Sequence, residues 1–171
     1  MSPCEEAPTR RAIYPGTFDP PHNGHLDVVH RTVRLFDEVV VAVYAQPTKP
    51  VLFDVGERVA LLQEALSDLP SVRVEPYSGL TVEYARAQQA CAIVRGLRAT
   101  GDFEFEYQLA LMNRHLCGEI EGVFLMTSLQ YAHISSSLVK EIARLGADLS
   151  GLVPPHVARA LARKFAAQAA P

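Results

Sequence analysis

The sequence predicts one α/β domain, Rossmann-like and doubly wound, with a five-stranded parallel sheet and helices on both faces. Two observations support this: short apolar runs that suit buried strands recur along the chain, and stretches of helical pattern separate them. Parallel neighbours in a sheet need crossover helices, and those helices cover both faces of the sheet. A chain of 171 residues is also the size of a single domain.

The strands and helices alternate in a regular order. The apolar run VVVAVY at residues 39–44 is typical of a central parallel strand. Asp54 and Glu57 have the spacing of a capping box that opens a helix, Gly146 ends a later helix, and Pro154 opens the last one. We expect strands at 12–14, 39–44, 72–75, 92–94 and 123–126. We expect helices at 24–36, 54–67, 81–89, 102–116, 136–145 and 154–165.

Both ends of the chain have the composition of tails. The first residues carry acids and prolines where a signal peptide would need a continuous apolar region, and the last six are rich in alanine. We expect a flexible tail at 1–10, one folded domain at 11–166 and a flexible tail at 167–171. No apolar stretch approaches the length of a membrane span, so we expect a cytoplasmic protein without a membrane partner.

The charge balance argues against a nucleic-acid partner. The chain has 16 Lys and Arg against 19 Asp and Glu, and so lacks the broad positive surface that nonspecific nucleic-acid binding needs. Any phosphate site must therefore be local. The three cysteines, Cys4, Cys91 and Cys117, are odd in number and lack metal-ligand spacing, which fits a reducing cytosol better than a disulfide framework.

The sharpest functional signal is the loop at residues 14–25, YPGTFDPPHNGH, which joins the first strand to the first helix. Gly16 and Gly24 allow close backbone approach to a ligand, and Thr17 offers a hydroxyl. His25 lies in the first turn of a helix whose N–H groups and dipole favour anions. Ligands of doubly wound sheets bind at the carboxyl ends of strands, where this loop lies. The loop therefore predicts a phosphate site.

The loop ends in an HxGH element, residues 22–25, and two other interpretations of this element stay open. One is a turn-rich connection that carries two surface histidines. The other is a zinc site at His22 and His25, for which the sequence offers no third ligand with suitable spacing. Placement directly after the first strand favours the phosphate site, and we expect no protein-bound metal.

Cationic side chains follow two other strands. Lys49 lies just past the second strand, in a loop whose movement would bring its charge over the site. Arg95 and Arg98 follow the fourth strand and, with a glycine between them, suit bidentate phosphate binding. The alternative for each is a solvated surface charge, which the position at the carboxyl edge of the sheet disfavours.

Two helical regions complete the candidate site. Glu106, Leu109 and Asn113 share one helix stripe, which suits either a pocket wall or core packing with polar ends. Residues 131–137 precede a helix, and their serine hydroxyls suit phosphate binding as well as capping. Lys140 adds charge one turn into that helix, unless it is simply solvated.

Four blocks stand in order along the chain: the loop at 14–25, RGLR with DFE at 95–104, QLA with MNR at 108–114, and ISSS with VKE at 134–141. From about residue 12 to residue 165 the sequence resembles the bacterial phosphopantetheine adenylyltransferases of the HxGH nucleotidyltransferase superfamily. The resemblance implies a nucleotidyltransferase domain that converts ATP and 4'-phosphopantetheine to dephospho-coenzyme A and pyrophosphate. It also implies Mg²⁺ carried by the nucleotide phosphates, and a homohexamer.

The resemblance assigns roles residue by residue. His25 would bind the α-phosphate and stabilise the transition state, while Thr17 and Lys49 would contact both reacting phosphates. Arg95 would hold the acceptor phosphate, and Glu106 would reach the ribose or order the loop. The catalytic set is Thr17, His25, Lys49 and Arg98. The ATP-binding set is Thr17, Phe18, His25, Gly96, Leu97, Arg98, Glu106, Tyr131, Ala132, His133, Ile134, Ser135, Ser136 and Ser137. The acceptor-binding set is Thr17, Lys49, Leu80, Thr81, Arg95, Leu109, Met112 and Asn113.

The sequence departs from the family pattern at Phe105, where tyrosine is common, and at His133, where phenylalanine is frequent. A nicotinamide-mononucleotide adenylyltransferase or a cytidylyltransferase would also keep His25, but the RGLR and QLAxMN blocks argue against both. A class I aminoacyl-tRNA synthetase would need a tRNA-binding domain, for which the chain has no room. A silent nucleotide-binding module is the remaining alternative, and the presence of His25, Lys49 and Arg95 argues against it.

Overall fold

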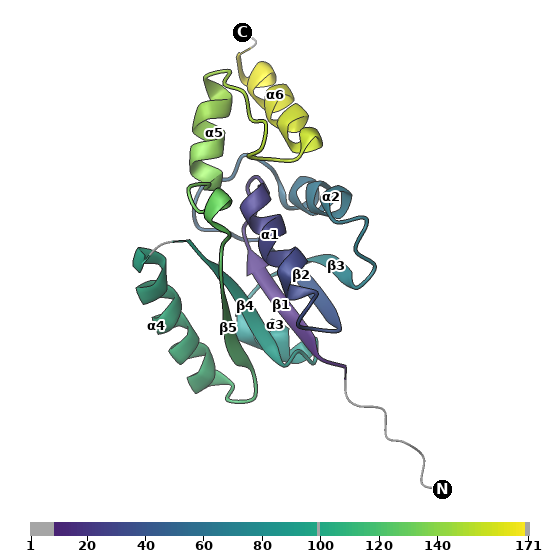
Figure 1. The fold of residues 1–171 in the computed structure, drawn as a ribbon, viewed down its shortest axis with the longest axis vertical. Coiled ribbons are helices and arrows are strands. Elements are labelled where there is room, and N and C mark those ends of the chain that lie inside the picture. The colour runs from purple at the N-terminus through teal and green to yellow at the C-terminus, as the bar shows by residue number, and fades with distance from the viewer. Residues whose placement is uncertain (1–8, 99, 170–171) are drawn as a thin grey trace, which may run out of the picture.

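The computed structural model describes residues 9–98 and 100–169 and contains the predicted five-stranded sheet (Figure 1). The strands are β1 (Arg11–Gly16), β2 (Glu38–Tyr44), β3 (Val72–Tyr77), β4 (Ala92–Leu97) and β5 (Glu121–Met126). All neighbours pair in parallel, in the order β3-β2-β1-β4-β5. The order in which strands are added reverses between β1 and β4, because β2 and β3 lie on one side of β1 whereas β4 and β5 lie on the other. A ligand crevice is therefore expected at the carboxyl ends of β1 and β4.

Six α-helices and one short 3-10 helix alternate with the strands in the described part of the chain. They are α1 (Asn23–Thr32), α2 (Val55–Ala65), α3 (Thr81–Ala87), α4 (Thr100–Leu116), η1 (Leu129–Tyr131), α5 (Ser136–Arg144) and α6 (Pro155–Ala169). The capping box of α2 is confirmed: Glu57 N donates to Asp54 Oδ1 over 2.8 Å, and Asp54 N donates to Glu57 Oε2 over 2.9 Å. These contacts satisfy two of the N–H groups that a helix start leaves unpaired.

Some elements differ in length from the expectation. β4 continues to Leu97 because its pairing with β5 continues to that residue. α6 continues to Ala169, past the expected end near residue 165, because the alanines that follow are strong helix formers. Residues 1–8 and 170–171, which belong to the expected tails, lie outside the described residues.

Alternating side chains divide the core between the two faces of the sheet. Tyr14 and Val41 pack in one cluster with Val28 of α1 and Leu62 of α2. The intervening side chains of β1 and β2, which alternate with those of the first cluster, pack in a second cluster with α3. Because successive side chains of a strand point to opposite faces, α1 and α2 cover one face and α3 covers the other (Figure 1).

A third apolar cluster lies beyond the carboxyl edge of the sheet, where α5 and α6 pack on each other (Figure 1). It buries Phe53, from the segment that precedes α2, and Ile134, from the segment that precedes α5. The cluster therefore fixes the start of α5 against the segment between β2 and α2.

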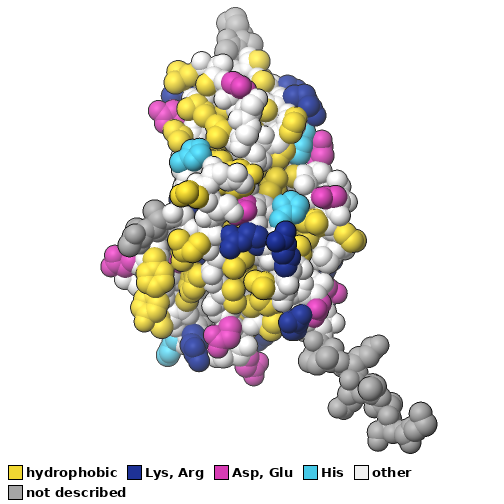
Figure 2. All heavy atoms as spheres, viewed as in Figure 1, with side chains coloured by type: hydrophobic (Ala, Val, Ile, Leu, Met, Phe, Trp, Pro, Cys, Tyr) yellow, Lys and Arg dark blue, Asp and Glu magenta, His cyan; other side chains and the backbone are white. Residues whose placement is uncertain are grey.

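The outer side of α4 leaves large apolar side chains in solvent. Figure 2 shows hydrophobic side chains gathered over this helix. The exposed residues of α4 include Phe103, Phe105, Tyr107, Leu111, Met112 and Leu116. Across the described ranges, no helix combines the length and the apolar character needed to cross a membrane.

Candidate active site

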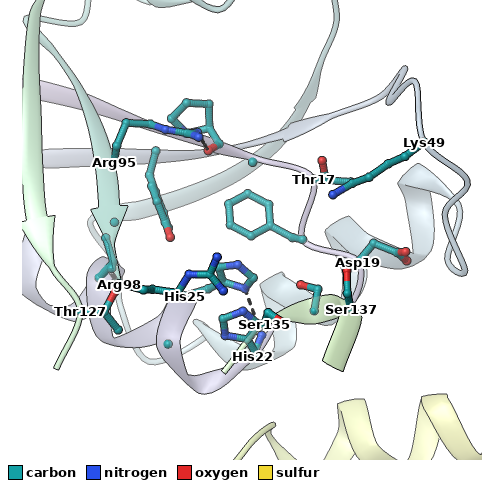
Figure 3. Close-up of a pocket in the computed structure, with 18 of the residues that line it drawn as sticks. Thr17, Asp19, His22, His25, Lys49, Arg95, Arg98, Thr127, Ser135 and Ser137 are labelled. Carbon is teal, nitrogen blue, oxygen red and sulfur yellow. Dashed lines mark hydrogen bonds between the residues drawn. The ribbon is translucent and has the colours of Figure 1, made fainter. Parts of the chain in front are cut away.

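A cavity of ≈ 420 Å³ lies at the carboxyl ends of β1 and β4, where the sheet order predicts a crevice (Figure 3). The N-termini of α1 and α5 both border it, so it meets two sets of helix N–H groups that favour anions. Of the sequence-predicted residues, the structure brings eleven together here: Thr17, Phe18, His25, Lys49, Arg95, Gly96, Arg98, Glu106, Ser135, Ser136 and Ser137.

His25 is held in this cavity as a neutral donor. The backbone N–H of His22 donates to Nδ1 of His25 over 3.2 Å (Figure 3). Burial, with the charges of Arg98 and Arg95 nearby, lowers the pKa of His25 well below its ordinary value. A neutral imidazole whose Nδ1 accepts a hydrogen bond carries its proton on Nε2. His25 therefore presents an Nε2–H donor.

His22 was absent from the predicted site, although it is the first histidine of the HxGH element. Its ring stacks on that of His25, with 3.6 Å between ring centroids, and only 4% of the residue is exposed. Burial lowers the pKa of His22 to about 3. Its Nδ1 has no hydrogen-bond partner within residues 9–98 and 100–169. The element itself was the signal that could have placed His22 in the site.

The loop after β1 owes its shape to close packing around Phe18. Phe18 has φ 53°, in the left-handed region, and its ring packs edge-on at 4.9 Å from His25 and 5.4 Å from Tyr14 between centroids. A Cβ added at Gly16 would lie 2.8 Å from the Phe18 ring. A glycine is needed there because no side chain fits.

Arg95 and Glu106 form a partly buried ion pair at one end of the cavity. Arg95 donates through Nε and NH2 to the two Glu106 oxygens over 2.7 and 2.5 Å, and through NH1 to Pro15 O over 2.8 Å. Burial would lower the pKa of Arg95, but the bond to Glu106 outweighs it and raises that pKa. The structure thus pairs the residue assigned to the ribose with the residue assigned to the acceptor phosphate.

A smaller cavity of ≈ 40 Å³ adjoins the first and shares Pro15, Arg95 and Glu106 with it. Its walls come from α4, α3 and the neighbouring strands. Three predicted acceptor residues, Thr81, Leu109 and Asn113, line it together with apolar side chains such as Ile93 and Phe124. The structure therefore separates a polar cavity from an apolar one by a single ion pair.

Seven predicted residues line neither cavity: Leu80, Leu97, Met112, Tyr131, Ala132, His133 and Ile134. Leu80 and Met112 are more than half exposed, whereas Leu97 and Ile134 are buried in the core. Ile134 still meets the site through its backbone, because its carbonyl oxygen accepts from Arg98 NH1 over 3.0 Å.

The structure also brings residues to the large cavity that the sequence reasoning missed, among them Tyr14, Asp19 and Thr127, and it places Lys140 there as well. Asp19 is 3% exposed and accepts a hydrogen bond from Lys140 Nζ over 2.7 Å. Lys140 was a candidate from its position one turn into the serine-capped helix. Asp19 lies in the same loop as Thr17, and that position was its signal.

The fold and the site define a nucleotide-binding α/β protein, and residues 13–142 match the family model described as cytidylyltransferase-like. A solved structure of a bifunctional NMN adenylyltransferase/ADP ribose pyrophosphatase from Francisella tularensis superposes with a TM-score of 0.70. It is 15% identical and covers 91% of this chain, which spans 49% of that structure. At this identity the likeness shows the fold.

The curated relatives narrow the family. A phosphopantetheine adenylyltransferase from Thermomicrobium roseum is 57% identical over 92% of this chain and 96% of its own length. One from Alkalilimnicola ehrlichii is 55% identical over 90% of each chain. The chain belongs to the phosphopantetheine adenylyltransferases of the cytidylyltransferase-like family.

Proposed function

We propose that this chain transfers the adenylyl group of ATP to 4'-phosphopantetheine, giving dephospho-coenzyme A and pyrophosphate. An oxygen of the acceptor phosphate attacks the α-phosphorus of ATP and forms the new P–O bond. The bond from the α-phosphorus to the bridging oxygen breaks, and pyrophosphate leaves with those electrons. The observation that carries the proposal is the pair of adjoining cavities, one lined by cations and N–H donors and one largely apolar.

The chemistry needs no general base, because a phosphate acceptor is already anionic near neutral pH. Catalysis consists of holding two anions together and stabilising charge at the α-phosphate. His25 Nε2–H donates to the α-phosphate, and Thr17 and Lys49 contact both reacting phosphates. Figure 3 supports this arrangement, since the Lys49 amine extends toward Thr17.

The two arginines, Arg95 and Arg98, bind different phosphate groups. Arg95 uses three of its five N–H groups within the described residues, so two are left to hold the acceptor phosphate. Arg98 and the N-terminus of α5, with its cap Ser135 and its first residues Ser136 and Ser137, hold the β- and γ-phosphates. The pantetheine arm extends from the acceptor phosphate along Leu109 and Asn113, and only part of it enters the smaller cavity, whose ≈ 40 Å³ is too small for the whole arm.

Magnesium enters this proposal as an ion carried by the nucleotide. Both carboxylates that line the large cavity are ion-paired, Asp19 with Lys140 and Glu106 with Arg95. The residues present therefore fit an ion whose ligands are phosphate oxygens and water. When bound, magnesium neutralises part of the phosphate charge.

We also propose that copies of the chain associate, as a homohexamer, in the cytoplasm. The exposed apolar side chains of α4 support association, because contiguous apolar surface of this kind marks interaction sites. The free thiols of Cys91 and Cys117 support a reducing compartment. Light scattering of the purified chain tests the assembly, and a monomer at micromolar concentration would contradict it.

Pyrophosphate release tests the activity. The chain is incubated with ATP and magnesium and with 4'-phosphopantetheine, nicotinamide mononucleotide or no acceptor. We expect release with phosphopantetheine alone, together with dephospho-coenzyme A. Release with the mononucleotide alone would make the rival transferase correct, and ATP binding without release in any arm would indicate a silent module.

A further inference from the structure

Lys49 lies in a surface loop that is fixed at both ends. The loop comprises residues 45–53, between β2 and α2, and is called the Lys49 loop below. At its start, Ala45 N donates to Tyr77 O over 2.8 Å. At its end, the ring of Phe53 is 2% exposed and packs in the cluster formed by α5 and α6.

Asp19 fastens the end of the Lys49 loop to the loop that carries Thr17. Its Oδ2 and Oδ1 accept from the backbone N–H groups of Leu52 and Phe53, both over 2.9 Å. Hydrogen bonds to an ionised carboxylate are stronger than neutral ones, and those of Asp19 are buried. Figure 3 shows the Asp19 carboxylate directed away from His25 and Arg98, toward the side of the cavity and not its centre.

Arg58, on α2, fastens both ends of the Lys49 loop to the backbone of Thr17. The residue is 1% exposed. Its NH1 donates to Thr17 O over 2.7 Å and to Tyr44 O, directly before the loop, over 2.8 Å. Its Nε donates to Phe53 O over 3.1 Å, at the end of the loop. One planar guanidinium thus joins three backbone segments, which an ammonium group cannot do with the same geometry.

We propose that Asp19 and Arg58 are positioning residues that hold Lys49 over the reacting phosphates by fixing the ends of the Lys49 loop to the loop that carries Thr17. Neither residue acts on the phosphates itself. Lys140, which lies on α5, adds to these contacts because it forms an ion pair with Asp19. The first residues of α5 line the cavity. The inference rests on the proposed adenylyl transfer, because the placement of Lys49 matters only if its amine contacts the phosphates.

A double-mutant cycle tests the proposal with four proteins: wild type, Asp19→Ala, Lys49→Ala and the double variant. If Asp19 acts through Lys49, its removal lowers kcat roughly tenfold or more in the wild-type background, as misplacement of a catalytic group does. In the Lys49→Ala background the same change lowers kcat less than about twofold, because coupled residues are not additive. An equal loss in both backgrounds would overturn the proposal.

Asp54→Ala is the matched control. Asp54 neighbours Phe53 and caps the helix that carries Arg58, but it does not line the cavity. Its loss weakens α2 as an ordinary capping defect does, without removing an acceptor from Leu52 or Phe53. We expect kcat to stay within about twofold of wild type, because the Asp54 side chain bonds to Glu57 N and its removal leaves the contacts of Asp19 and Arg58 with the Lys49 loop in place. A loss as large as that of Asp19→Ala would assign the effect to general destabilisation.

Amide hydrogen exchange gives a readout that does not depend on activity. We expect Asp19→Ala to reduce the protection of the Leu52 and Phe53 amides, and Asp54→Ala to leave it unchanged. Unchanged protection in a folded Asp19→Ala protein would overturn the anchoring. If Asp19→Ala does not fold, Asp19→Asn and Arg58→Lys are put through the same cycle, with the same opposing outcomes. A wild-type protein that makes no dephospho-coenzyme A while exchange behaves as expected would reject the proposed function and leave the anchoring intact.

Discussion

The two cavities of this molecule differ in the chemical groups that line them. The large one offers helix N-termini, a neutral imidazole and the cations Lys49, Arg95 and Arg98, whereas the small one offers apolar side chains of α4 and its neighbouring strands. The large cavity is suited to stabilise charge that develops during a reaction, and the small cavity is suited to recognise a ligand by its shape. The difference teaches that changes in the large cavity should act on kcat and changes in the small one on the KM for the acceptor.

The largest expected effect comes from His25→Ala, which removes the donor at the α-phosphate. We expect turnover to fall more than about a hundredfold with the fold intact, as loss of one transition-state donor does. Steady-state kinetics and circular dichroism check this. His30→Ala is the control, because His30 lies on the same helix and lines neither cavity. Near-normal turnover in folded His25→Ala would remove His25 from the reaction.

Glu106→Gln tests the border between the cavities. The change replaces a carboxylate that orients Arg95 with a neutral amide, so Arg95 loses its bidentate partner. We expect the KM for phosphopantetheine to rise roughly tenfold, with a smaller change in the KM for ATP, because a charged pair of this kind is worth more than a neutral bond. A larger rise in the KM for ATP than in that for phosphopantetheine would assign Glu106 to the nucleotide instead.

Leu109→Ala sharpens the comparison from the apolar side. We expect the KM for phosphopantetheine to rise about threefold to tenfold while kcat holds, since a few methylene groups contribute little more than this to selectivity. Leu35→Ala is the matched control, because Leu35 is 47% exposed and lines neither cavity. A fall in kcat with unchanged KM would break the proposed division between the cavities.

Acidification should act on stability more than on turnover. His22 and His25 are buried with lowered pKa values, whereas in the unfolded chain they titrate near 6.5. Below pH 6.5 the unfolded state binds more protons, so stability is lost as pH falls, by about 1 kcal/mol per histidine over the first pH unit. Thermal unfolding between pH 7 and 5 checks this. His22→Asn should show about half the pH dependence, because one of two such groups is removed. An unaltered slope would contradict it.

The phosphate side of the site was predictable because its signals are local in the chain. Thr17 and His25 stand within one loop and one helix turn, and glycines, caps and strand ends mark such places in a sequence. The stripe on α4 was less predictable. Spacing defines the face of a helix but not which of its residues pack against the sheet. The structure brings Leu109 to the small cavity, while Met112 is largely exposed.

The contacts of Arg58 with the backbone at both ends of the Lys49 loop left no pattern to detect in the sequence. An arginine on an amphipathic helix is normally solvated, yet Arg58 is buried and bonds to carbonyl oxygens as far as 41 residues away. Its partners are backbone atoms, which every residue carries, so no spacing of residue types announces the contact. Asp19 is different, because its place in the loop of Thr17 was a signal, and only its bonds to the backbone N–H groups of Leu52 and Phe53 left no pattern.

The strand order also has a consequence for how the protein matures. β1 pairs with β2, its near neighbour in sequence, and with β4, which follows about 80 residues later, so the half of the sheet made of β1, β2 and β3 can assemble first. The cavity lacks Arg95, α5 and Lys140 until the second half has been synthesised. In the proposed function ATP needs both halves of this cavity, so by mass action the nucleotide stabilises the completed fold.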